Sequence, residues 1–166
     1  MSDHPIRLKA GDFLQVAMGI LASGHRLRFM AHGGSMYPLV RSGDIVEVKP
    51  VNASSVRLGD MLLCSVGGER VVVHRVIGLA TEDGRVVFFT KGDALRSADA
   101  PVYPEQVLGC VTAIRREGRT LRIEDGWRRL MSRPWARLWP LSYRLRLMPR
   151  PARYIARKLA QRLSTF

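Results

Sequence analysis

The first candidate for chemistry is a serine that follows two glycines and could act as a nucleophile. Ser35 comes after Gly33 and Gly34, and Pro38 stiffens the chain just beyond it. A serine hydroxyl becomes nucleophilic only beside a general base, and it needs N–H donors for the oxyanion it creates. Glycines before the serine let a substrate approach the backbone closely. The same residues are common in plain turns, so they make Ser35 a candidate nucleophile and leave that structural alternative open.

Two histidines compete for the role of base. His74 lies in a β-rich segment, VVVHRVIG (71–78), where a lone histidine is usually a hydrogen-bonded core or surface residue. His32 precedes Ser35 by three residues, a spacing that does not readily place it opposite the hydroxyl. An imidazole is largely neutral near pH 7 and can accept a proton there without special burial. His74 is therefore the favoured base and His32 the rival.

A histidine base usually needs a carboxylate that orients its second nitrogen. Asp93 and Asp99 lie in TKGDALRSAD (90–99) and are the candidates. Asp93 follows Gly92 and could instead form an Asx turn. Lys91 would suggest a Ser/Lys pair, but we interpret it as structural.

Four segments together resemble a known family. In order, they are GGSMYPLVRSGD (33–44), LGDMLLC (58–64), VVVHRVIG (71–78) and TKGDALRSAD (90–99). They resemble the conserved boxes of type I signal peptidases and their relatives, which include the autoproteolytic SOS repressors. The resemblance covers about two fifths of the chain. It implies coiled antiparallel sheets and a serine endopeptidase that cleaves an extended peptide after small side chains.

The resemblance also assigns roles to residues. A histidine in the third segment is similar to the histidine-base branch, so it implies Ser35 as nucleophile, His74 as base, Asp99 as the orienting acid and Asp93 as a secondary or structural partner. Many relatives carry a serine where this chain has Gly33, and the Ser35 backbone N–H is expected to hold the oxyanion. The expected oxyanion and substrate-binding positions are Gly33, Gly34, Met36 and Pro38. No metal and no cofactor are expected.

The elements around these residues are mostly strands. Residues 11–23 have Phe13, Val16, Ala17 and Ile20 at helical spacing, with Asp12 as a cap and Gly24 as a stop. Short β-rich runs separated by turn residues then predict strands near residues 27–31, 45–50, 61–66, 69–80, 85–92, 107–117 and 120–124. The pattern predicts a mainly β fold, a coiled sheet or small barrel after a short N-terminal helix.

Charge divides the chain unevenly. Residues 127–166 hold 11 Lys and Arg and no acid, whereas the first 126 residues hold all 14 acids against 16 Lys and Arg. We therefore expect an N-terminal helical segment (1–25), a peptidase-like β domain (26–125) and a basic, proline-interrupted helical tail (126–166). The tail, with interleaved tryptophans, predicts binding to an anionic membrane surface. A solvated or partner-docking tail stays open, and nucleic acid is a weaker alternative because no recognition motif supports it.

The chain shows no apolar run long enough to span a membrane and no clear cleavable signal, so a cytoplasmic or peripheral location is expected. Cys64 and Cys110 lie in apolar runs and are expected to be buried thiols, with a disulfide left open. The predicted function is a serine endopeptidase acting on a peptide or precursor protein. The alternatives are a non-catalytic peptide-binding module of the same fold and a regulatory autoprotease.

Overall fold

The computed structural model describes residues 8–68 and 70–123 of the chain. Along these residues the helices and strands are α1 (Ala10–Ala22), β1 (Leu27–Met30), β2 (Ile45–Lys49), η1 (Ala53–Ser55), β3 (Met61–Val66), β4 (Arg70–Glu82), β5 (Arg85–Lys91), η2 (Pro104–Gln106), β6 (Val107–Arg116) and β7 (Arg119–Arg122). The prediction of a mainly β fold after a short N-terminal helix is confirmed. The predicted tail, its helices and its membrane contact lie outside the described residues.

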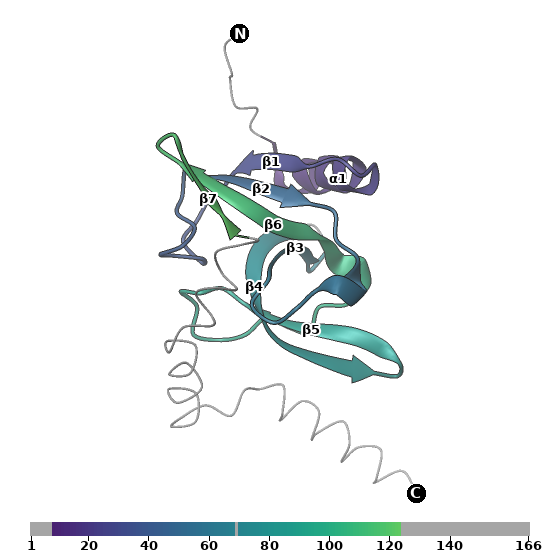
Figure 1. Ribbon diagram of the computed structural model, residues 1–166. Helices are drawn as coiled ribbons and strands as arrows, with labels where there is room; N and C mark the ends of the chain where they lie inside the picture. Colours follow the sequence, from purple (N-terminus) through teal and green to yellow (C-terminus); the bar gives the residue numbers. More distant parts are fainter. Residues whose placement is uncertain (1–7, 69, 124–166) are drawn as a thin grey trace, which may run out of the picture.

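The strands form one antiparallel sheet. Its order is β1-β2-β6-β3-β4-β5, and β7 pairs with β6 beside this path. Figure 1 shows the sheet curled along this order, with α1 beside β1 at one end and the β4–β5 hairpin at the other. β6 lies between β2 and β3, so this late strand joins the first hairpin of the sheet to the second.

β4 is the strand that positions the candidate base. Its first half pairs with β3 up to Arg75, opposite Met61, and its second half pairs with β5 from Arg75, opposite Lys91. A register shift follows between Val76 and Gly78. His74 and Arg75 therefore lie where β4 stops pairing with β3 and begins to pair with β5. As consecutive strand residues, their side chains point to opposite faces of the strand.

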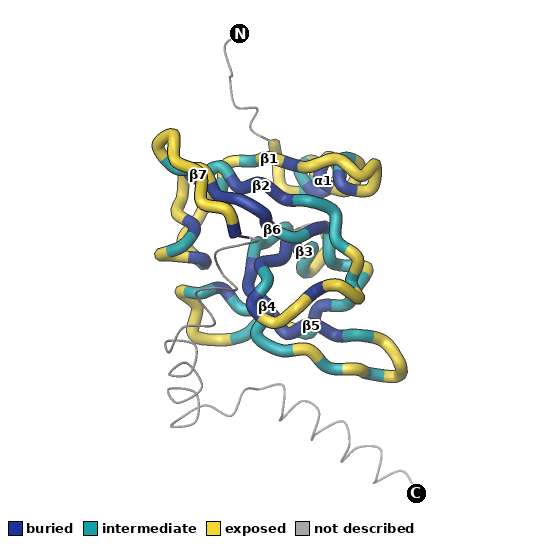
Figure 2. Tube along the Cα trace, in the orientation of Figure 1, coloured by how far each residue is buried: buried dark blue, intermediate teal, exposed yellow. Residues whose placement is uncertain are grey.

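Figure 2 shows that the buried residues lie mainly along the strands. They form two apolar clusters, and alternate residues of β3 belong to different clusters, so the two clusters lie on opposite faces of this strand. The first packs α1 against the sheet, and its buried members include Ala17, Leu21, Met36, Val46, Val48, Met61, Leu63, Val111 and Ile114. The second includes Leu62, Cys64, Val76, Phe88 and Val102. Because α1 contributes to the first cluster, the helix and the sheet share one core.

The helix differs in detail from its prediction. It begins at Ala10 after Lys9, which makes no side-chain cap, and Asp12 lies inside the first turn without capping it. Its buried residues are Leu14, Ala17 and Leu21, whereas Val16 is 42% exposed. Ala17 is buried in the first cluster, and Phe13 and Ile20 pack against it, so only Val16 of the predicted apolar face is wrong.

Candidate active site

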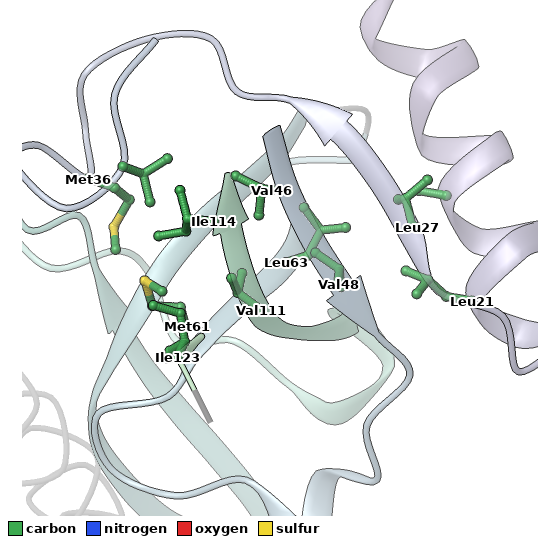
Figure 3. Close-up of a cluster of buried hydrophobic side chains, with 12 residues drawn as sticks. Leu21, Leu27, Met36, Val46, Val48, Met61, Leu63, Val111, Ile114 and Ile123 are labelled. Carbon is green, nitrogen blue, oxygen red and sulfur yellow. The ribbon is translucent and has the colours of Figure 1, made fainter. Parts of the chain in front are cut away.

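The candidate nucleophile lies in the long connection between β1 and β2, residues 31–44, which we call the serine loop. Its two ends are joined: the Ala31 N–H donates to the Asp44 carbonyl at 2.7 Å, and the Gly43 N–H donates to the Ala31 carbonyl at 2.9 Å. Met36, 3% exposed, anchors the loop in the first apolar cluster. Figure 3 shows its side chain at one end of that cluster, near Ile114 and Met61. Any contact of Met36 with a substrate therefore falls to its backbone.

The serine loop contacts the segment after β5, residues 92–101, which we call the acid loop. The Ala94 N–H donates to the Ser35 carbonyl at 2.9 Å. The same carbonyl packs on Gly92, where an added Cβ would lie 2.7 Å from the oxygen. Gly92 thus lets the backbone of Ser35 approach the loop that carries both candidate acids.

His74 binds Asp99. Its Nδ1 lies 2.6 Å from the Asp99 Oδ2, and the Thr90 hydroxyl donates to the same oxygen at 2.8 Å. The Asp99 N–H also donates to the Thr90 carbonyl at 2.9 Å, so side chain and backbone both fix this acid. Thr90 pairs with Val76 across the β4–β5 ladder, which puts it on the same face as His74. Both His74 and Thr90 are buried, at 2% and 0% exposure.

The surroundings keep the Asp99 carboxyl ionised. Burial raises the pKa of this group, but the hydrogen bonds from His74 and Thr90, with the charges of His74 and Arg70, outweigh burial and hold its pKa below the usual value. An ionised carboxylate only accepts hydrogen bonds, so His74 Nδ1 must carry the donated proton. In this tautomer Nε2 is the ring nitrogen that can accept a proton.

Asp93, the other acid, binds the neighbouring residue. Arg75 donates from Nε to Asp93 Oδ1 at 2.8 Å and from its NH2 group to Oδ2 at 2.6 Å. Its NH1 group donates to the Gly59 carbonyl at 2.9 Å. Arg75 is 6% exposed, so this fork ties the acid loop to β4 from inside the protein.

The Ser35 hydroxyl and His74 form no hydrogen bond within the described residues. Catalytic hydrogen bonds are often loose before substrate binds. Over the same residues the Ser35 N–H donates to no acceptor. Ser35 is half-buried, Gly34 is exposed, and nothing lies within 4 Å of a Cβ added at either Gly33 or Gly34. There is thus open space beside the two glycines that precede Ser35.

The remaining loop positions have their own geometry. Gly33 has φ +91°, a conformation that L side chains rarely adopt, which explains a glycine at this position. Pro38 is exposed and follows a cis peptide bond from Tyr37.

Within the described residues, the other histidines and Lys91 form no hydrogen bond with His74 or Asp99. His32 is exposed, and His25 bonds the Ser23 hydroxyl at 3.0 Å. Lys91 ends β5 opposite Arg75. No disulfide joins Cys64 and Cys110. Cys64 is buried as expected, which raises the pKa of its thiol to about 12, and Cys110 is half-buried. Over residues 8–68 and 70–123, no three His, Cys, Asp or Glu side chains gather as metal ligands.

Sequence reasoning missed three groups that hold the site: Arg75, Thr90 and Arg116. Arg75 lies inside the segment 71–78 and Thr90 is the first residue of the segment 90–99, so membership of these segments is the signal that could have found them. Arg116 lies 72 residues from its partner Asp44, and no local pattern links the two.

The comparisons with known proteins reach part of the chain. No protein-family model matches it. Over 76 residues it is 32% identical to signal peptidase I W of Bacillus subtilis strain 168. The matched segment is 45% of this chain and 40% of that relative, so the chain covers less than half the relative's length. Among the described residues, no helix has the length and apolar character to span a membrane. At this identity and coverage, the chain is a distant, partial relative of a signal peptidase.

Proposed function

We propose that this protein is a serine endopeptidase in which Ser35 is the nucleophile, His74 the general base and Asp99 the orienting acid. The observation that carries the proposal is the 2.6 Å bond between His74 Nδ1 and Asp99, on a loop that also bonds the Ser35 backbone. The partial similarity to a signal peptidase agrees with this chemistry.

The proposed reaction begins when the Ser35 hydroxyl attacks a peptide carbonyl. His74 Nε2 removes the hydroxyl proton and later gives it to the leaving amine, while Asp99 stabilises the imidazolium that forms in between. The Ser35 N–H holds the oxyanion of the tetrahedral intermediate. Water then releases the acyl group from Ser35 with His74 again as base.

The proposed substrates are peptides or precursor proteins with small residues before the cleaved bond. This specificity comes from the resemblance to signal peptidases. The basic segment 127–166 is proposed to hold the protein at an anionic membrane surface, a peripheral location for precursor processing.

The test compares single variants of the full chain on such peptides and on a fluorophosphonate probe for active serines. We expect Ser35→Ala to abolish cleavage and labelling, and His74→Ala to reduce the rate by several orders of magnitude. His32→Ala is the matched control, since His32 is exposed and bonds neither candidate acid. Cleavage that survives Ser35→Ala contradicts the proposal. A folded wild type that binds peptide but neither cleaves nor labels is a binding module instead.

A further inference from the structure

The serine loop is fixed by a contact from a distant strand. Arg116, the last residue of β6, donates from Nε to Asp44 Oδ1 at 2.7 Å and from its NH2 group to Asp44 Oδ2 at 2.6 Å. The NH2 group also donates to the Leu39 carbonyl at 3.0 Å. A fork of two parallel charge-assisted bonds fixes orientation as well as distance.

Asp44 is built into the base of the serine loop. Its side chain is 4% exposed, its Oδ2 accepts the Arg41 N–H at 2.7 Å, and its carbonyl accepts the Ala31 N–H. The bond from Arg116, against the opposing effect of burial, holds the pKa of Asp44 below its usual value. The Asp44 carboxylate therefore binds the end of the loop at Arg41, its backbone carbonyl binds the start of the loop at Ala31, and Arg116 holds the carboxylate.

The route from this clamp to the nucleophile is short. Leu39, which Arg116 also binds, adjoins Val40, whose N–H donates to the Met36 carbonyl at 3.0 Å. Met36 follows Ser35 directly and is buried in the core. The loop is thus fixed at its base by Arg116, in its middle by Met36, and at Ser35 by Ala94.

We propose that Arg116 is a positioning residue for the nucleophile: through Asp44 and Leu39 it sets where Ser35 stands relative to His74. Arg116 touches neither His74 nor Asp99 and takes no part in proton transfer. The inference rests on the proposed peptidase function. Because the serine loop is long, its end strands can stay paired while its middle shifts, so loss of Arg116 is expected to slow the reaction of molecules that remain folded.

The test uses Arg116→Ala in the full chain, with Arg115→Ala as the matched control. Arg115 is exposed and its side chain points to the opposite face of β6. Displacements of about 1 Å far from the chemistry can cost on the order of 100-fold in rate. We expect a fall of that order in kcat for Arg116→Ala, with KM near its wild-type value. The melting temperature is also expected to fall, because the buried Asp44 carboxylate loses its partner charge, and neither kcat nor the melting temperature is expected to change for Arg115→Ala.

Chemical rescue distinguishes positioning from a merely structural role. Arg116 is a third exposed and lines an open depression of about 480 Å³, so a small cation can reach the vacated site. We expect ethylguanidinium to restore much of the kcat of Arg116→Ala and to leave wild type unchanged. Arg116→Lys, which lacks the fork, is expected to be intermediate, and it replaces the alanine variant where that variant does not fold.

Amide hydrogen exchange keeps this inference separate from the peptidase proposal. In Arg116→Ala the amides of Ala31 and Gly43 are expected to exchange faster, while those of β3 and β4 keep wild-type rates. If the wild type shows no Ser35-dependent cleavage, the peptidase function is contradicted. Amide exchange at Ala31 and Gly43 then tests by itself whether Arg116 fixes the serine loop. Wild-type kcat, or wild-type exchange at both loop amides in Arg116→Ala, overturns the role given to Arg116.

Discussion

Asp93 and Asp99 lie on one loop, six residues apart, and bind consecutive residues of β4 whose side chains point to opposite faces of that strand. Asp99 receives His74, and Asp93 receives Arg75. Two acids that look alike in sequence therefore do different work: one orients the candidate base, and the other fastens the acid loop that carries both.

This division predicts opposite results for two conservative variants. Asp99→Asn keeps the shape of the site but loses the charge that orients His74, so we expect kcat to fall by about 10⁴-fold with the fold intact. Asp93→Asn removes the charge that accepts the fork of the buried Arg75, which is expected to lower the free energy of unfolding by about 3 kcal/mol. Peptide cleavage and urea unfolding measure the two effects. A stability loss in Asp99→Asn as large as that in Asp93→Asn would refute the division.

Thr90 offers a finer test of how Asp99 is held. Thr90→Val removes the hydroxyl that donates to Asp99 Oδ2 and nearly keeps the side-chain shape. Because a hydrogen bond to a charged group is among the stronger ones, we expect its loss in Thr90→Val to lower kcat on the order of tenfold. Thr90→Ser keeps the hydroxyl and is the matched control. Equal rates for the valine and serine variants would show that the Thr90 hydroxyl does not act on Asp99.

Gly92 is expected to admit no larger residue. An added Cβ would meet the Ser35 carbonyl at 2.7 Å and the Leu95 side chain at 2.9 Å, and the backbone oxygen cannot yield without moving Ser35. We expect Gly92→Ala to lower kcat on the order of 100-fold. Gly19→Ala, in open space on α1, is the glycine control and should gain about 1 kcal/mol of helix stability without changing kcat. Unchanged kinetics for Gly92→Ala would mean that the Ser35–Gly92 contact has no catalytic importance.

Acid should destabilise the fold through identifiable carboxylates. The pKa values of Asp44, Glu47 and Asp99 are held below their ordinary values, chiefly by hydrogen bonds that outweigh burial. A group whose pKa is lower in the folded state stabilises the fold above its unfolded pKa, about 4 for these acids, and loses that stabilisation as pH falls through the folded value.

We therefore expect the free energy of unfolding to decrease below about pH 4. Asp44→Asn should be less stable than wild type at pH 7 and should depend less on pH below 4. Urea unfolding at pH 7, 5, 4 and 3 measures this, and parallel pH curves for the two proteins would contradict the contribution assigned to Asp44.

The sequence predicted the strands well because turn residues separate short β-branched runs, and each such run forms a strand. It also pointed to Ser35, His74 and Asp99 through four ordered segments, and the structure brings His74 and Asp99 together. It could not pair Asp44 with Arg116, because that contact depends on the β2–β6 register, which a single chain does not reveal. Nor could the sequence identify Arg75 as the partner of Asp93, because a charged residue on a strand usually faces water, whereas Arg75 is buried.

The position of β6 has a consequence for how the molecule is made. Ser35 lies in the loop between β1 and β2, whereas His74 lies in β4 and Asp99 in the loop after β5. Among the described strands, β6 alone pairs with both groups, through β2 and β3. On the ribosome β6 emerges after all of them. A chain still being synthesised can therefore hold the proposed nucleophile and the proposed base on separate strand pairs. We expect no peptidase activity until β6, which carries none of the three proposed catalytic residues, has paired with β2 and β3.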